Sequence, residues 1–297
     1  MSSEILHIEK LSKHYGLVDA LSNLTLSIKQ GQVFGILGPN GSGKTTTLSI
    51  VMGIVSPNSG SYSWFEQSNS SEYHKNIGSL IETPNFYPYL TALKNLTIIA
   101  KIKGIDVSDI ERVLKITGLY ERRNYRFDTF SLGMKQRLAL SSVLLGDPQV
   151  LVLDEPANGL DPQGIADIRE IIKAQALLGK TIILASHILD EVEKVCTHAV
   201  ILKKGKLIAS GKVNELLSTK EQLFLSSDRN SELFEFLVRA GVCNNVTIVE
   251  KGILLEVKQP YGSAYINKLA FENGFMLNAI ETRNQSLEEQ FLELIKK

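Results

Sequence analysis

The chain has 297 residues and no net charge, because 32 Lys and Arg residues balance 32 Asp and Glu residues. This length predicts one large domain and one smaller domain, and the charge balance lacks the basic excess typical of nucleic-acid binding, so we expect no nucleic-acid partner. The sequence contains neither a run of ~18 apolar residues nor a signal-peptide pattern. We therefore expect a chain that is not exported and does not cross a membrane by itself.

The first part of the chain combines short strands with a glycine-rich turn. Alternation of polar and apolar residues predicts strands over 4–9 and 21–28. The nearly continuous apolar run "QVFGILG" predicts a buried strand that enters the turn at 38–43. The other elements expected here are a helix at 44–53 and strands at 59–67 and 77–81.

Apolar residues then recur with a helical period, and this pattern predicts a helical subdomain over about 88–147. After it we expect a strand in "QVLVLD", a helix at 162–178, a strand in "TIILAS", a helix at 188–195 and a strand pair in "AVILKKGKLIAS". Strands that alternate with helices predict an α/β fold with a mostly parallel sheet and helices on both faces.

A smaller unit follows Gly211. Its predicted elements run strand, helix, strand, strand, helix, strand, which is the order of a ferredoxin-like unit. They lie at 222–226, 231–240, 245–250, 253–258, 261–272 and 275–281. A last helix is expected from Ser286, which forms a capping box with Glu289. We thus predict a domain over 1–217 and an accessory α+β domain over 221–297, with a structural, dimerising or regulatory role left open.

The segment "GPNGSGKTT" matches the phosphate-loop pattern G-x-x-x-x-G-K-[ST] and lies between a predicted buried strand and a predicted helix. Its glycines allow a tight turn in which backbone N–H groups face an anion. Lys44 would reach the β and γ phosphates, and the Thr45 hydroxyl would reach Mg²⁺. The alternative is a purely structural glycine turn. The expected phosphate-binding residues are Gly38, Pro39, Asn40, Gly41, Ser42, Gly43, Lys44, Thr45 and Thr46.

Two acids end the apolar strand "QVLVLDEP". Asp154 would lie at the sheet edge beside the phosphate loop, where a carboxylate holds Mg²⁺ directly or through water. Glu155 would then be free to act as a general base on the attacking water. A solvated strand end stopped by Pro156 is the alternative, but it does not explain two acids after so apolar a strand.

Three further segments identify a family. The run "FSLGMKQRL", the run "NGLDP" and His187 after "TIILAS" resemble ATP-binding-cassette (ABC) ATPases in order and spacing. The signature of that family reads L-S-G-G-Q, which Ser131 and Gly133 match and from which Leu132 and Met134 depart. Ser131 at a helix N-cap and Gly133 beside it can still offer a hydroxyl and N–H groups to a phosphate.

The resemblance implies a P-loop NTPase cassette: a mixed, largely parallel sheet flanked by helices, with an N-terminal antiparallel β part and a helical subdomain. It also implies that two cassettes pair head to tail around two ATP molecules, so that Lys44 of one chain and Ser131 of the other hold one γ-phosphate. His187 would contact that phosphate, and Asp161 would lie in the loop that crosses the interface.

Tyr15 occupies the place of an aromatic residue that stacks on adenine. Taken alone, His187 and Tyr15 would be an ordinary surface histidine and an ordinary strand-end tyrosine.

One cassette without a membrane span implies that a separate permease forms the transport pathway, with this chain peripheral at the cytoplasmic face of a bacterial cell membrane. In cassettes the loop just before the helical subdomain contacts the permease, and "ETPNFYPYL" occupies that place in this sequence. Its apolar residues Phe86, Tyr87, Tyr89 and Leu90 either line a groove for a permease helix or belong to the core of the helical subdomain, and some could do both. Most cassettes carry Gln where this chain has Glu82, and we expect Glu82 to reach Mg²⁺.

Within the family, the sequence looks most like the ATP-binding subunits of bacitracin export and lantibiotic immunity. The leading hypothesis is an ATPase that powers export or expulsion of an antimicrobial peptide, with ATP and Mg²⁺ as cofactors and a homodimer as the active form. The alternatives are export of a sodium ion or a hydrophobic drug, and a soluble cassette of DNA repair or ribosome rescue. Neither the coiled-coil insert of repair cassettes nor the second cassette of ribosome factors is present in the sequence.

Overall fold

The protein was analysed as a computed structural model, which describes residues 3–65, 75–82, 85–216, 222–258 and 260–283. The chain divides into two compact units, Met1–Val213 and Asn214–Lys297. Among the described residues, no helix has the length and apolar character needed to span a bilayer. The predicted last helix from Ser286 lies outside the described residues.

The first unit begins with a three-stranded antiparallel sheet in the order β2-β1-β4. Its strands are β1 (Glu4–Tyr15), β2 (Val18–Lys29) and β4 (Ser59–Trp64). β1 and β2 are longer than predicted. The strand register shifts near Lys10 and Asn23, which adopt positive φ. Such β-bulges interrupt the alternation on which the prediction rested.

The main sheet has six strands in the order β5-β6-β7-β3-β8-β9 and is parallel except for the antiparallel pair β8 and β9. The strands β3, β6 and β7 are buried along their whole length. Because β3, β5, β6 and β7 are parallel, their carboxyl ends meet at one edge, where ligands bind in open α/β sheets. The strands are β3 (Val33–Leu37), β5 (Ile77–Leu80), β6 (Val150–Asp154), β7 (Thr181–Ser186), β8 (His198–Lys203) and β9 (Lys206–Lys212).

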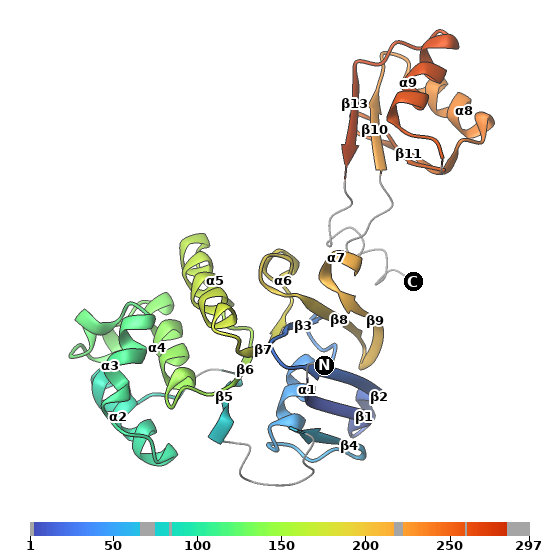
Figure 1. The fold of residues 1–297 in the computed structure, drawn as a ribbon. Coiled ribbons are helices and arrows are strands. Elements are labelled where there is room, and N and C mark those ends of the chain that lie inside the picture. Colours follow the sequence, from blue (N-terminus) through green and yellow to red (C-terminus); the bar gives the residue numbers. More distant parts are fainter. Residues whose placement is uncertain (1–2, 66–74, 83–84, 217–221, 259, 284–297) are drawn as a thin grey trace. The chain divides into compact units, whose positions relative to one another are not determined.

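The helices of this unit form two groups (Figure 1). α1 (Lys44–Val51), α5 (Pro162–Leu177) and α6 (Leu189–Val195) accompany the main sheet, and the short α7 (Val213–Leu216) spans the boundary between the two units. α2 (Ala92–Lys103), α3 (Asp109–Ile116) and α4 (Leu132–Leu144) pack on one another as a helical subdomain, with 3₁₀ turns at Tyr120–Arg122 and Phe127–Thr129. The predicted α/β cassette fold, with its antiparallel part and helical subdomain, is confirmed.

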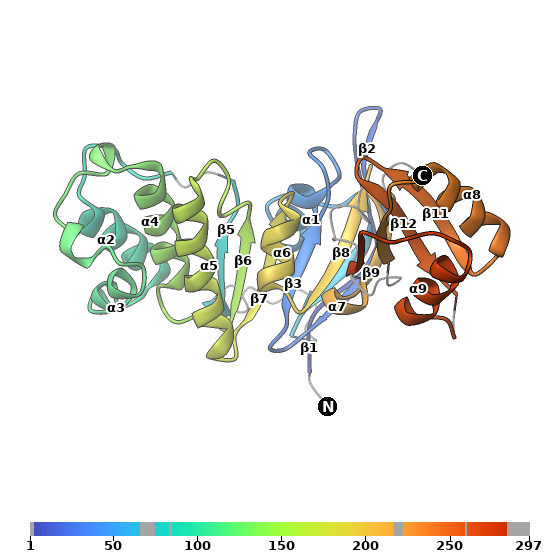
Figure 2. The same cartoon turned by 90° about the horizontal axis from the view of Figure 1, so that it is seen from above.

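The second unit is an antiparallel sheet in the order β11-β12-β10-β13, with helices α8 and α9 packed on the same face of it (Figures 1 and 2). Leu223 and Leu225 of β10 pack with Leu233 of α8 and Ile266 of α9 in one core, and Phe224 between them is also buried. Its elements are β10 (Gln222–Ser226), α8 (Asn230–Ala240), β11 (Cys243–Val249), β12 (Gly252–Val257), α9 (Ser263–Glu272) and β13 (Ala279–Arg283). The last strand begins later than predicted, since Phe275 is used in the core under the helices.

Candidate functional site

The loop 38–43 joins β3 to α1 in a conformation that requires glycine. Gly43 has φ 106°, and a Cβ there would lie 2.5 Å from the carbonyl oxygen of Ala20. A Cβ on Gly38 would lie 2.3 Å from Oγ of Ser42 and 2.5 Å from the carbonyl oxygen of Leu202. The β8–β9 turn also holds the loop, because the N–H of Gly205 donates a hydrogen bond to the Ser42 carbonyl at 3.0 Å. The neighbouring backbone thus explains the glycines at 38 and 43.

Lys44 supplies a cation at the first position of α1. Its side chain is 5% exposed, and Nζ donates to the carbonyls of Gly38 at 2.8 Å and Pro39 at 3.3 Å. The same atom lies 3.3 Å from Oε1 of Glu155. The first N–H groups of a helix have no intrahelical partner, so this end of α1 offers both N–H donors and a positive charge to an anion.

Asp154 ends β6 beside this loop. Its carboxylate is buried and accepts a hydrogen bond from the Thr45 hydroxyl, while Oδ1 has no hydrogen-bond partner among the described residues. Burial raises the pKa of Asp154, and the negative charges of Glu155 and Glu82 raise it further against the lowering effects of Thr45 and Lys44. A hydroxyl beside an unpartnered carboxylate oxygen is a donor set that suits a hard divalent cation.

No group of three or more His, Cys, Asp or Glu within the described residues is arranged as a ready-made metal site. Mg²⁺ does not require one, because it keeps several waters and is bound in proteins by one or two carboxylates together with substrate phosphates. The predicted ligands Thr45, Asp154 and Glu82 therefore fit Mg²⁺ as part of a metal–nucleotide complex, and do not form a separate metal cage.

Glu155 and His187 lie side by side because they follow neighbouring strands. Glu155 has φ 48°, and its N–H donates to the Ala185 carbonyl at 2.9 Å. Its Oε2 lies 2.7 Å from Nδ1 of His187. One carboxylate thus connects the cation of the phosphate loop with the histidine after β7. The structure brings Lys44, Asp154, Glu155 and His187 together as expected, in one cluster at the sheet edge.

Glu82 follows β5 and is exposed, with φ 60°. It is near enough to Asp154 to affect the pKa of that carboxyl, as its proposed place near the metal requires.

Tyr15 ends β1 with 50% of its surface exposed, and the ammonium of Lys13 lies 5.1 Å from the centre of its ring. Thr46 is half-buried in α1.

Ser131 and Gly133 line a second site, which is a cleft between the start of α4 and the loop that leads into α5. Oγ of Ser131 caps α4 by accepting from the N–H of Met134 at 3.3 Å. The space around Gly133 is open, and Leu132 is 54% exposed. Asp161 caps α5 on the other side, accepting from the N–H of Gly164 at 2.8 Å. The two caps border a cleft of about 380 Å³.

The aromatic residues of the loop 85–91 divide between the core and the surface. Phe86 is 9% exposed and its ring centre lies 5.0 Å from that of Phe127, so Phe86 belongs to the core of the helical subdomain. Tyr87 and Tyr89 are 49% and 63% exposed. The loop is therefore anchored by one ring and presents two others at the surface.

Sequence reasoning missed Asn95, which holds this loop. Its buried side chain accepts from the N–H of Tyr87 at 2.8 Å and donates to the carbonyls of Tyr87, Leu90 and Thr91 at 3.1–3.4 Å. The signal was an amide on the buried stripe of α2, between Ala92 and Leu96. A buried polar group at such a position needs hydrogen-bond partners, which the loop backbone provides.

Comparison with known proteins agrees with this geometry. The family model for ABC transporters matches residues 21–158. The chain is 37% identical to the bacitracin transport ATP-binding protein BcrA of Bacillus licheniformis, over 99% of this chain and 98% of that protein. It is 39% identical to the lantibiotic transport ATP-binding protein SrtF of Streptococcus pyogenes, over 78% of this chain and 99% of that one.

A solved structure of the cassette MJ0796, a dimer bound to ADP and phosphate, has a TM-score of 0.63 and 25% identity, over 70% of this chain and 99% of that one. Cassettes of this kind bind nucleotide and hydrolyse ATP. The chain shares this fold and carries a phosphate loop, two acids at the end of β6 and a histidine after β7, and it is a member of the ABC transporter ATP-binding protein family.

Proposed function

We propose that this chain powers the export or expulsion of an antimicrobial peptide through a separate membrane permease, and so gives immunity or resistance. The observation that carries the proposal is the match to the bacitracin transport protein along nearly the whole chain. That match extends through the second unit, whereas the match to the lantibiotic transport protein covers 78% of the chain. The similarity therefore includes more than the ATP-hydrolysing cassette.

In this proposal Lys44 and the N–H groups at the start of α1 hold the phosphates, and Tyr15 stacks on the adenine. Thr45, Asp154 and Glu82 hold Mg²⁺, which neutralises phosphate charge when bound. The unpartnered Oδ1 of Asp154 and the hydroxyl of Thr45 support this assignment.

Glu155 is the proposed general base. Its carboxylate accepts a proton from the attacking water, while Nδ1–H of His187 donates to Oε2 and orients the group. Lys44 lies 3.3 Å from Oε1, so the carboxylate is held from both sides. A base held in this way is oriented before it acts, which reduces the entropic cost of reaching the reactive arrangement.

The second cleft supports a homodimer as the active form. Ser131 and Gly133 line it with an open approach, and they belong to the helical subdomain and not to the Lys44 cluster. We propose that they bind the γ-phosphate held by Lys44 of a second copy. The likeness to a dimeric cassette supports this arrangement.

The proposed contact with the permease is the loop that Asn95 holds. A fixed backbone with Tyr87 and Tyr89 exposed loses little conformational entropy on binding, and aromatic side chains are frequent anchors of interfaces. Through this contact the chain would sit peripherally at the cytoplasmic face of the cell membrane.

The test is deletion of the gene, followed by growth with bacitracin, lantibiotics and unrelated membrane-active compounds. We expect sensitivity to rise for one class of peptide and to be restored by the wild-type chain but not by Glu155→Gln. Unchanged sensitivity to every peptide would contradict the proposed substrate. In a second arm, the tagged chain purified from solubilised membranes should bring down a multi-span protein, and recovery of ribosomes or DNA would contradict the transport role.

A further inference from the structure

The helices α5 and α6 each begin at a part of the hydrolytic site. The chain leaves Glu155, passes through the loop to Asp161 and enters α5. It leaves His187 and enters α6 two residues later. The two helices lie side by side in both views of the molecule and contact each other (Figures 1 and 2). Their relative position therefore bears on how Glu155 meets His187.

An ion pair connects the two helices. Nε of Arg169 on α5 donates to Oε2 of Glu191 on α6 at 3.3 Å, and a terminal guanidinium nitrogen donates to Oε1. The side chains are only 18% and 9% exposed. The hydrogen bonds that Arg169 donates to Glu191 raise the pKa of its guanidinium. Two parallel N–H···O bonds fix orientation as well as distance.

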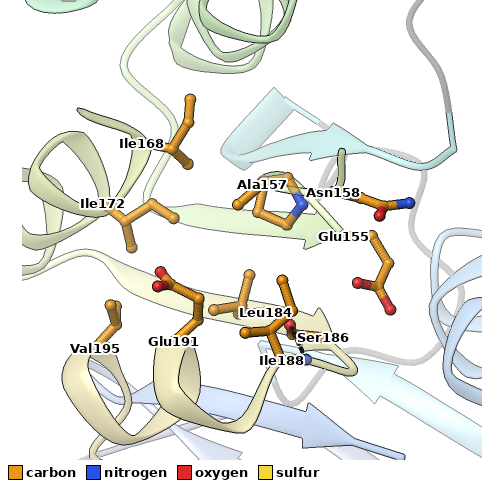
Figure 3. Close-up of a pocket in the computed structure, with 11 residues that line it drawn as sticks. Glu155, Ala157, Asn158, Ile168, Ile172, Leu184, Ser186, Ile188, Glu191 and Val195 are labelled. Atoms are coloured by element: carbon orange, nitrogen blue, oxygen red, sulfur yellow. Dashed lines mark hydrogen bonds between the residues drawn. The ribbon is translucent and has the colours of Figure 1, made fainter. Parts of the chain in front are cut away.

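The rest of the contact between these helices is mainly apolar. Figure 3 shows Ile168 and Ile172 of α5 facing Glu191 and Val195 of α6 around a small cavity. Its volume is about 10 Å³, no more than one water molecule needs. Glu155 lines the same cavity. Apolar packing is non-directional, whereas the ion pair gives a directional link between the two helices.

We propose that Arg169 and Glu191 are positioning residues that hold the Glu155 carboxylate against His187. The Glu155–His187 contact of 2.7 Å and the Arg169–Glu191 pair would then be two links of one frame made of the ends of β6 and β7 and the helices that follow them. The inference rests on the roles proposed above for Glu155 and His187.

The first test is the ring tautomer of His187, measured by ¹⁵N NMR on the full chain without nucleotide at pH 8 and assigned with His187→Ala. In the wild type, donation from Nδ1 to Glu155 holds the proton on Nδ1. In Arg169→Met and in Glu191→Gln we expect loss of this signature. The control is Lys173→Met, which removes an exposed cation from the same helix and should keep it.

The second test is steady-state hydrolysis of ATP. Misplacing a catalytic group lowers the rate without weakening substrate binding, so we expect a kcat about tenfold to a hundredfold lower in Arg169→Met at an unchanged KM. The exchanged pair Arg169→Glu with Glu191→Arg should restore most of the rate. Arg169→Lys keeps the charge but loses the two-pronged geometry, and it replaces Arg169→Met if that variant melts below the assay temperature.

A wild-type tautomer and a wild-type kcat in folded Arg169→Met would overturn the proposal. So would an exchanged pair that restores thermal stability but neither the tautomer nor the rate, because the pair would then be structural only. If His187→Ala and Glu155→Gln both leave hydrolysis unchanged, the proposed catalytic roles fail instead, and the two failures are distinguishable.

Discussion

Replacement of Asp154 by Asn should stabilise the protein in the absence of nucleotide. Burial raises the pKa of Asp154, and Glu155 and Glu82 add to this effect, so the ionised carboxylate costs folding free energy. Asn keeps the shape and an oxygen that accepts from Thr45. For a unit of 213 residues, Met1–Val213, each kcal/mol of this cost that Asn removes raises Tm by about 2–4 °C.

The pH dependence follows from the sign of the shift. The folded state binds the Asp154 proton more tightly than the unfolded state, whose pKa is near the ordinary value of 3.8. The cost is therefore fully present at pH 8, where the carboxylate is ionised, and it disappears as pH falls through the raised pKa. The difference in Tm between Asp154→Asn and the wild type should be largest at pH 8 and shrink toward pH 4.

The assay is thermal unfolding across this pH range, with and without Mg²⁺ and ATP. Asp190→Asn, which removes an exposed carboxylate from α6, is the matched control and should give no pH-dependent gain. With Mg²⁺ and ATP present, the wild type should have the higher Tm, because bound Mg²⁺ and ATP stabilise it more than a variant that lacks the Asp154 carboxylate. A lower Tm for Asp154→Asn without nucleotide at pH 8 would refute the electrostatic reasoning.

Two more predictions concern the same site, and a third concerns the loop that Asn95 holds. Glu155→Gln should lower kcat by about 10²–10⁴-fold while ATP binding persists, as fluorescent-nucleotide titration would report; near-normal turnover would contradict a general base. Glu82→Gln should tighten ATP binding without Mg²⁺ and converge with the wild type at saturating Mg²⁺, and identical Mg²⁺ titrations would contradict this. Asn95→Leu should speed hydrogen exchange at 87–91 and reduce recovery of the permease, because it leaves loop groups unpaired at about 1–3 kcal/mol each; unchanged exchange would contradict the role of Asn95.

Much of the fold could be predicted because its signals are local. The buried strands β3, β6 and β7 appear as apolar runs, and the phosphate-loop pattern marks the turn between β3 and α1. The order of strands in the sheet could not be read in this way. It depends on contacts between segments far apart in the chain, such as β3 with β7, and these bring Lys44 and His187 to one edge.

The residues that sequence reasoning missed share a physical signature. Arg169 lies on a stripe with Ile165, Ile168 and Ile172 on α5. Glu191 lies on a stripe with Val192 and Val195 on α6 and with the N-cap residue Ile188. A charge at the i, i+3, i+4, i+7 positions of a buried face requires a partner, since an unpaired buried charge is strongly destabilising. Opposite charges on the stripes of consecutive helices therefore predict a pair, although the sequence alone does not say that the two helices touch.

The backbone at Glu82 and Glu155 is a further feature that a residue pattern does not reveal. Both acids follow adjacent parallel strands, β5 and β6, and both have positive φ, a conformation that costs a side-chain-bearing residue about 1–2 kcal/mol. Glycine would adopt it without this cost but would bring no carboxylate. The strain therefore accompanies a turn that keeps both acids near Asp154, so that three carboxyl groups lie in the neighbourhood of the Lys44 ammonium. Mutual repulsion of this kind is relieved by a divalent cation, which is why the Asp154 and Glu82 variants should respond to Mg²⁺ in the directions given above.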